Sequence, residues 1–246
     1  MEWEDQGIVL SVRRHGESSA ILSVFTSSHG RCLGLVKGGM SKGQKSTLQK
    51  GNLLAIKWRA RLEAHLGTFS CNLLRSNAMK FMDDALKISI LNSACSVVDL
   101  VLPEREGYQN LYLQFFSLID NLSESRFIIN YIFWEIDLLQ SLGFGLDLSR
   151  CCVSGEKEDL FYLSPKTGRA VSEKKGKPYH DRLFPLPSFL INRTNSDSIS
   201  SVEIKNAFNI TTYFLGRYVF GVDKKEPWDR KQLVDRLIKM DTMSSS

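Results

Sequence analysis

The sequence lacks the features that mark secreted, membrane-spanning and metal-dependent proteins. No apolar run reaches the roughly 18–20 residues that a membrane-spanning helix needs. The acidic start, MEWEDQG, has neither a basic n-region nor an apolar h-region, so we expect a cytosolic protein without a secretory signal. Five scattered cysteines argue against a disulfide framework, and the four histidines lack the spacing of metal ligands.

Acidic residues are missing from a long stretch near the N-terminus. None occurs between Glu17 and Glu63, whereas eight basic residues fall from Arg31 to Arg61. Residues 1–80 carry 12 Lys and Arg against 5 Asp and Glu, while the remaining 166 residues carry 20 against 22. The net charge of +5 is therefore concentrated in the first part of the chain, for which a polyanion is the natural partner.

Residues 6–75 show the short, alternating apolar pattern of β-strands. Ile8, Leu10 and Val12 recur at period two and are expected to share one face. The segment Gly38–Gly51 is rich in glycine and lysine without an apolar period, so we expect a long mobile loop. Five strands with one long basic loop in about 75 residues predict a small Greek-key barrel of the OB type.

Helical periodicity begins at about residue 76 and predicts a second, mainly helical region. Its first stripe starts at Met79 and Met82 and ends before Pro103, and a later one stops at Gly143, an expected C-cap. A loop-rich insert then interrupts the helices. The predicted domains are an OB-type domain (1–76), a helical domain (77–148 and 188–241) and the insert (149–187).

The stretch LLAIKWRARL gives the sharpest indication of a binding surface. At strand period Trp58 belongs to an apolar face, whereas Lys57, Arg59 and Arg61 share the other face about 7 Å apart. Because no acid interrupts this row, we expect it to follow a phosphate backbone rather than to be merely solvated. The expected nucleic-acid contacts are Arg13, Arg14, Lys37, Lys42, Lys45, Lys50, Lys57, Arg59 and Arg61.

Motifs for catalysis and nucleotide binding find little support. Gly43 is followed by Gln44, so the P-loop pattern fails, and no helix is expected to begin there. Cys152 and His180 can be written as a nucleophile and a base, but any chain with this many cysteines and histidines offers such pairs. We therefore expect no enzymatic activity and no cofactor.

Several longer stretches share their order with a known family. They are WEDQGIVLSVRRHGESSAILSVFTSSHGRCLGLVKGG, LQKGNLLAIKWRARLEAHLG, ESRFIINYIFWEIDLLQSLGFGLDLSRC, DLFYLSPKTGRAVS and PWDRKQLVDRL. Together they resemble the RecO family of bacterial recombination mediators, particularly its alphaproteobacterial branch, over essentially the whole chain. The resemblance implies an α+β fold: a five-stranded OB-fold barrel, then a mainly α-helical domain with a zinc-ribbon-like insert.

The resemblance also implies a non-enzymatic function. The family would bind single- and double-stranded DNA, anneal complementary strands and act in DNA repair and homologous recombination. The implied partners are RecR and the acidic C-terminal tail of single-strand-binding protein. RecA is an indirect partner, which RecR would load onto DNA coated with single-strand-binding protein. The implied location is cytoplasmic and nucleoid-associated, without a membrane partner.

Zinc-bearing members of that family carry two Cys-x-x-Cys pairs in the insert. Here Cys151 matches the first ligand position, Ser154 the second, Ser172 the third and Lys175 approximately the fourth. Structural zinc needs four nitrogen or sulfur ligands, which one thiolate cannot supply. The insert is therefore expected to lack the metal ligands, with Cys151 as a small buried side chain.

Two other functions remain open from the sequence. An OB-fold adaptor that binds RNA or an acidic protein partner would use the same basic barrel, and competition between single-stranded DNA and structured RNA would separate the two. A thiol enzyme would require an exposed, low-pKa Cys151 or Cys152.

Overall fold

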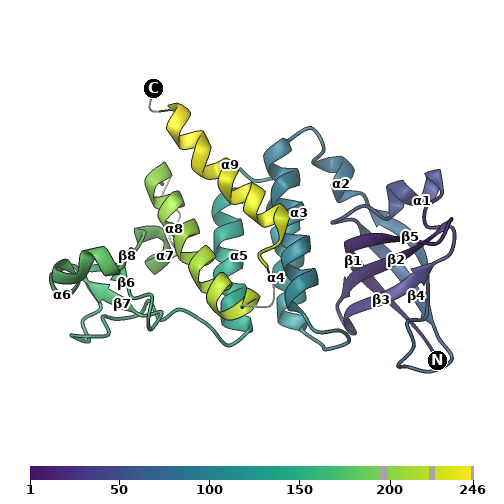
Figure 1. Ribbon diagram of the computed structural model, residues 1–246, viewed down its shortest axis with the longest axis horizontal. Coiled ribbons are helices and arrows are strands. Elements are labelled where there is room, and N and C mark those ends of the chain that lie inside the picture. The colour runs from purple at the N-terminus through teal and green to yellow at the C-terminus, as the bar shows by residue number, and fades with distance from the viewer. Residues whose placement is uncertain (194–198, 222–224, 245–246) are drawn as a thin grey trace. The chain divides into compact units, whose positions relative to one another are not determined.

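The structure is a computed structural model that describes residues 1–193, 199–221 and 225–244 (Figure 1). Its contacts divide the chain into two compact units, Met1–Phe127 with Pro227–Leu233 and Ile128–Glu226 with Val234–Ser246. The first unit opens with the strands β1 (Glu2–His15), β2 (Ser19–Thr26), β3 (Gly30–Val36), β4 (Leu53–Arg59) and β5 (Thr68–Arg75).

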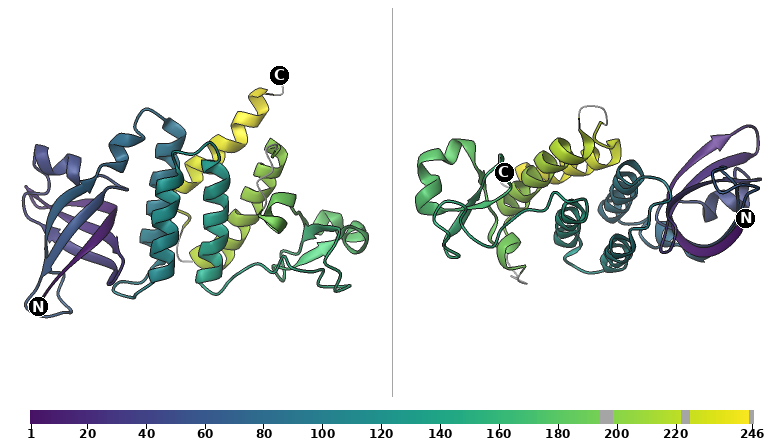
Figure 2. Two further views of the ribbon diagram at one scale, coloured as in Figure 1. Left: turned by 180° about the vertical axis from the view of Figure 1, so that it is seen from behind. Right: turned by 90° about the horizontal axis from the view of Figure 1, so that it is seen from below.

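These strands form a closed barrel in the order β1-β2-β3-β5-β4, seen from below in Figure 2. All neighbouring strands are antiparallel except β3 and β5, which pair in parallel at Leu35 and Thr68. The predicted five-stranded OB-type barrel is thus confirmed. Its core contains Val9, Leu22, Val24, Cys32, Val36, Leu48, Leu54, Ile56, Trp58 and Phe69.

The alternation of β1 is broken by an irregularity that the sequence pattern did not reveal. The register against β2 shifts between Val9 and Ser11. Val9 lies in the barrel core and Val12 packs against the same core, whereas Ile8 and Leu10 are buried outside that cluster. An extra residue in a bulged strand reverses the faces that follow it. The prediction that Val12 shares a face with Ile8 and Leu10 is therefore wrong.

The glycine- and lysine-rich segment after β3 contains a helix, α1 (Lys42–Thr47), instead of the predicted loop. The buried Asn52 donates from Nδ2 to the carbonyls of Ser46 (3.0 Å) and Thr47 (3.1 Å), the last two of the helix. Leu48 follows directly and lies in the barrel core. Carbonyls at a helix end need such partners, and this one comes from outside the helix. The expectation that no helix begins near Gly43 is wrong for this reason.

Helices then cover one side of the barrel in the first unit. They are α2 (Asn77–Lys80), α3 (Ala85–Val101) and α4 (Gln109–Asn121). Asp84 caps α3 by accepting from the backbone N–H groups of Leu86 (3.0 Å) and Lys87 (3.1 Å). Met79 lies in the separate helix α2 and Met82 lies before α3, and both are exposed, so the predicted apolar stripe is wrong at its first two positions.

Aromatic packing attaches α4 to the outside of the barrel. The Phe25 ring of β2 lies 5.4 Å from that of Tyr112 and 6.1 Å from that of Phe115, measured between centroids. The side of β2 around Phe25 is therefore occupied by protein and is closed to a ligand.

The second unit combines helices with a small sheet. Its helices are α5 (Phe127–Ser141), α6 (Glu173–Gly176), η1 (Lys177–Arg182), α7 (Ser188–Asn192), α8 (Ser201–Phe214), η2 (Leu215–Phe220) and α9 (Trp228–Ser244), the last shared with the first unit. The insert forms a sheet in the order β7-β6-β8, from β6 (Leu160–Leu163), β7 (Ala170–Ser172) and β8 (Phe184–Pro185). Gly143, at φ +86°, ends α5 as predicted. Within the described residues, no helix has the length and apolarity to cross a membrane.

A partly buried ion pair joins Lys50, just before β4, to Asp229 at the start of α9 within the first unit. Lys50 Nζ lies 2.7 Å from Asp229 Oδ2 and 2.9 Å from Ser96 Oγ, and the Ser96 hydroxyl donates to the same carboxylate at 2.5 Å. Burial alone would raise the pKa of Asp229, but the hydrogen bonds from Lys50 and Ser96 outweigh it and hold that pKa below its usual value. Lys50 is thus engaged in the structure of this unit.

We expect Asp229→Asn to lower the free energy of unfolding at neutral pH by about 1–3 kcal/mol, because Lys50 would lose its charged partner. A carboxylate with a lowered folded pKa stabilises fully above its unfolded pKa and loses this effect as pH falls through the folded pKa. The variant should therefore differ from the parent at neutral pH and converge with it in acid, as measured by urea denaturation. Asp181→Asn, at an exposed carboxylate, is the matched control, and equal stability of both variants at neutral pH would contradict the assignment.

Candidate nucleic-acid interface

Backbone contacts bring three segments to one end of the barrel. The β1–β2 turn lies here, since His15 pairs with Ser19, and β3 ends here, since Val36 pairs with Ala20. The chain after β3 is held against the turn by a hydrogen bond from Met40 N to the Ser18 carbonyl at 2.9 Å. Helix α1 follows directly, so its lysines are placed at the same end.

Four of the predicted contact residues lie at this end, and we call them the basic end: Arg13, Lys37, Lys42 and Lys45. Arg13 is near the end of β1, Lys37 follows β3, and the two other lysines belong to α1. All four side chains are exposed, and no ion pair holds any of them within the described part of the chain. Exposed cations without a carboxylate partner are available to neutralise phosphates.

Three further predicted contacts are placed differently. Arg14 donates to the carbonyls of Gly16 (3.1 Å) and Glu17 (3.2 Å) and so closes the β1–β2 turn. Lys50 is engaged with Asp229. Arg61 is exposed, but it lies in the loop after β4, because that strand ends at Arg59. The predicted row of three cations on one strand is therefore two residues on the strand and one beyond it.

The two strand cations of that row are neutralised by the neighbouring strand. In the antiparallel pairing of β1 and β4, Glu2 lies opposite Arg59 and Glu4 opposite Lys57. Lys57 Nζ is 2.5 Å from Glu2 Oε1 and 2.7 Å from Glu4 Oε1, and Arg59 Nε donates to Glu2 Oε2. The expectation of a row without interleaved acid is correct along the chain and wrong across the sheet.

These four side chains, which we call the charge ladder, hold one another in the ionised state. Hydrogen bonds from Arg59 and Lys57 lower the pKa of Glu2 to about 2, and the hydrogen bonds with Glu2 raise the pKa values of Lys57 and Arg59. Two carboxylates and two cations carry no net charge at neutral pH. The ladder therefore attracts a polyanion less than the sequence pattern predicts. The alternating acids of EWE at the start of β1 were its signal in the sequence.

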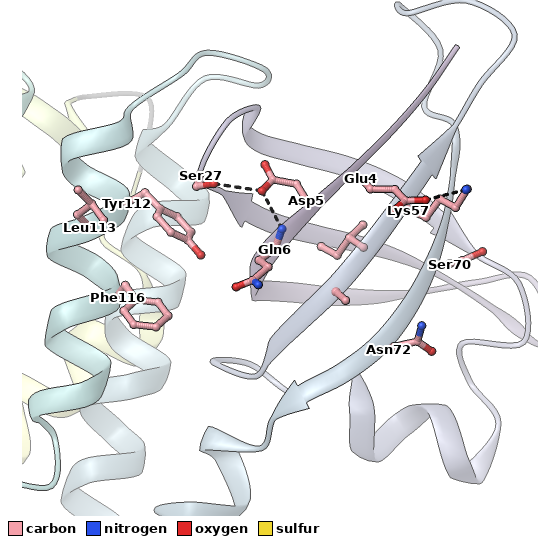
Figure 3. A pocket seen from close by; sticks show the side chains of 12 residues that line it. Glu4, Asp5, Gln6, Ser27, Lys57, Ser70, Asn72, Tyr112, Leu113 and Phe116 are labelled. Atoms are coloured by element: carbon pink, nitrogen blue, oxygen red, sulfur yellow. Dashed lines mark hydrogen bonds and ion pairs between the residues drawn. The ribbon is translucent and has the colours of Figure 1, made fainter.

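A groove of about 800 Å³ lies beside the charge ladder, between β1, β4, β5 and α4 (Figure 3). Hydroxyl and amide groups of Gln6, Ser70 and Asn72 line it on the strand side, and the aromatic rings of Tyr112 and Phe116 line it on the helix side. The charged side chains of Glu4, Asp5 and Lys57 also line it, with Lys57 paired to Glu4. This mixture suits hydrogen bonding and ring contacts better than it suits a phosphate.

The insert brings together three of the four positions at which the family resemblance implies zinc ligands, Cys151, Ser154 and Ser172. Cys151 is 1% exposed, and its sulfur accepts from the backbone N–H of Ser154 at 3.4 Å. Burial would raise the pKa of Cys151, but the polar groups of Ser154 and Ser172 close to the sulfur lower it to about 6. Lys175 is exposed on α6.

The remaining donors do not form a recognisable metal site. Cys151, Ser154 and Ser172 offer one thiol and two hydroxyls, and among the described residues no three His, Cys, Asp or Glu side chains are grouped as metal ligands. The prediction of Cys151 as a small buried side chain is confirmed, and all five cysteines are free thiols. Cys151 has a lowered pKa but is buried, so it lacks the exposure that the thiol-enzyme hypothesis requires.

Comparison with known proteins finds similarity to one family over most of the chain. Residues 1–77 match the family model described as "Recombination protein O N terminal", and residues 82–227 match "Recombination protein O C terminal". Proteins named DNA repair protein RecO are similar over most of their length. One from Cereibacter sphaeroides is 43% identical over 96% of this chain and 98% of its own, and one from Rhodospirillum centenum is 42% identical over 99% and 98%. The chain, with its barrel and helical part, therefore belongs to the RecO family of DNA repair proteins.

Proposed function

We propose that this protein is a non-enzymatic DNA repair and recombination mediator that binds DNA through the basic end of its barrel. The observation that carries the proposal is the cluster of Arg13, Lys37, Lys42 and Lys45, exposed and without carboxylate partners in the described residues. Membership in a family of DNA repair proteins makes DNA the polyanion that these cations would meet.

The proposed mechanism needs neither bond chemistry nor a cofactor. Two complementary strands repel each other through their phosphates, and a protein that neutralises those phosphates releases condensed counterions and lowers the repulsion. Single- and double-stranded DNA both present this backbone, so the basic end would bind both and promote annealing. Arg61 would add a phosphate contact at the other end of the barrel. Lys57 and Arg59 would do so only by exchanging a carboxylate of the charge ladder for a phosphate.

The proposed partners rest on family membership. They are RecR, the acidic C-terminal tail of single-strand-binding protein and, indirectly, RecA on the coated strand. A cytoplasmic, nucleoid-associated location follows from the same proposal. Strand annealing on DNA coated with single-strand-binding protein, with and without its C-terminal tail, tests this part: annealing that does not depend on the tail would contradict it.

Replacing Lys37, Lys42 and Lys45 together with alanine should weaken binding to single-stranded DNA and flatten its dependence on salt. The slope of log affinity against log salt should fall by about 0.7 for each lost contact, hence by about 2 in total, because each phosphate contact releases counterions. Fluorescence anisotropy of a labelled oligonucleotide over a salt series measures this slope.

The matched control removes the same charge from the insert, at the exposed Lys157, Lys166 and Lys174. Its slope should equal that of the parent. Equal slopes for the two triple variants would remove the basic end from the interface. Preference for structured RNA over single-stranded DNA in competition would favour an RNA-binding adaptor instead.

Replacing both Glu2 and Glu4 with glutamine should strengthen DNA binding, because Lys57 and Arg59 would lose their intramolecular counterions. We expect the salt slope to steepen by about 0.7 for each cation that then contacts a phosphate. The double variant Glu158→Gln/Asp181→Asn removes two exposed acids from the insert and controls for net charge. If both double variants change the slope equally, the charge ladder lies outside the path of the DNA.

A further inference from the structure

Three aromatic rings lie nearly parallel at the end of the barrel opposite the basic end. The rings of Trp3 and His29 are 4.0 Å apart between centroids with 11° between their planes, and those of Trp3 and Trp58 are 5.7 Å apart with 16°. Trp58 is only 3% exposed, whereas 35% of the His29 side chain is exposed and Trp3 is half-buried. We call these three residues the ring group, and its accessible surface belongs to His29 and Trp3.

Polar contacts hold the ring group in place before any ligand arrives. Asp5 accepts from the backbone N–H of Ser28 at 3.0 Å and from the hydroxyl of Ser27 at 3.1 Å, and its Oδ2 lies 3.2 Å from His29 Nδ1. The turn that carries the His29 ring is thus fixed to β1. On the other side, Trp58 Nε1 donates to the Leu66 carbonyl at 3.1 Å. Rings that are already ordered lose little conformational entropy when a ligand stacks on them.

A cavity of about 340 Å³ adjoins these rings. The loop after β4 contributes Glu63 to its wall, and Arg105 fixes this loop by donating to the carbonyls of Glu63 and His65. The Arg105 guanidinium also lies 5.5 Å from the centroid of the Trp58 ring. The volume is near the lower end of the range for small-ligand sites, about 300–1,000 Å³, and suits one flat heterocycle.

The charges around the cavity indicate which part of a nucleic acid fits there. The carboxylates of Glu2 and Glu63 line it together with two cationic groups, the Arg105 guanidinium and the Met1 amino group, both of which donate to backbone carbonyls. With charges of both signs the cavity offers a phosphate little net attraction, whereas an uncharged base would meet aromatic faces and hydrogen-bond acceptors. The exposed Arg61, two residues before Glu63, is placed to meet the adjoining phosphate.

We propose that this cavity binds one nucleobase of a single strand, and that this base stacks on the exposed part of the ring group, at His29 and Trp3. The inference rests on the proposed DNA-binding function and adds to it a site that reads the base instead of the phosphate. Bases in a duplex are already stacked on each other, so only an unpaired base can enter. The pocket would therefore favour single-stranded over double-stranded DNA, which the basic end alone does not distinguish.

The test compares oligonucleotides that carry the same phosphates with and without bases. For the unmodified protein, we expect an oligothymidylate to bind about tenfold more tightly than an abasic chain of equal length, within the about 1–3 kcal/mol measured for base–aromatic stacking. A 2-aminopurine base in the oligonucleotide should lose fluorescence on binding, because it stacks on a ring. Neither measurement requires a variant to fold.

His29→Ala should remove most of this base-dependent gain and leave the salt slope unchanged, since no phosphate contact is lost. Trp3→Leu is the second variant, and Tyr179→Ala, at an exposed ring of the insert, is the matched control. Equal affinity for the oligothymidylate and the abasic chain, or an undiminished gain in His29→Ala, would overturn the proposal. The lysine variants of the basic end separate the two proposals, because they change the salt slope and should preserve the base-dependent gain. Absence of binding to every oligonucleotide would overturn both.

Discussion

The register of β1 determines the chemistry of the barrel surface. This one strand pairs with β4 over Glu2–Ile8 and with β2 over Gly7–His15, which closes the barrel. Gly7 lies at the changeover, where an added Cβ would be 2.6 Å from Ile56 Cδ1. Because side chains alternate along a strand, a slip by one residue would exchange the faces of all the residues before Gly7. The ring group and the charge ladder both exist only in the observed register.

The two ends of the barrel offer interactions of different range. Charges at the basic end act over about a Debye length, roughly 8–10 Å at physiological salt, and are sensitive to ionic strength. Ring stacking acts only in contact and depends little on salt. A mediator that must handle coated, single and paired strands would gain from both, since charge gathers DNA and stacking selects unpaired bases. The charge ladder between β1 and β4 keeps part of the barrel neutral, which limits the area over which charge acts.

Much of the fold was predictable from local patterns. The alternation that places Ile56 and Trp58 in the barrel core is confirmed, because a strand with one buried face must alternate. Apolar residues recur at helical spacing along α4 and its C-cap, and the buried ones are Leu111, Tyr112, Phe115, Leu118, Ile119 and Leu122. Local patterns failed where a residue outside the element decided the outcome. Helix α1 depends on the carbonyl contacts of Asn52, and the bulge in β1 depends on pairing with β2.

The candidate site divides in the same way. The sequence by itself determined that the first part of the chain is basic and that its strands form a small barrel. Only the tertiary structure decided which cations are available, because Glu2 and Glu4 are about 55 residues away from Lys57 and Arg59 and reach them across the sheet. The same holds for Trp3 and His29, which become one ring group through the fold. Charge is counted along a chain, but neutralisation and stacking depend on distance in space, which strand pairing sets.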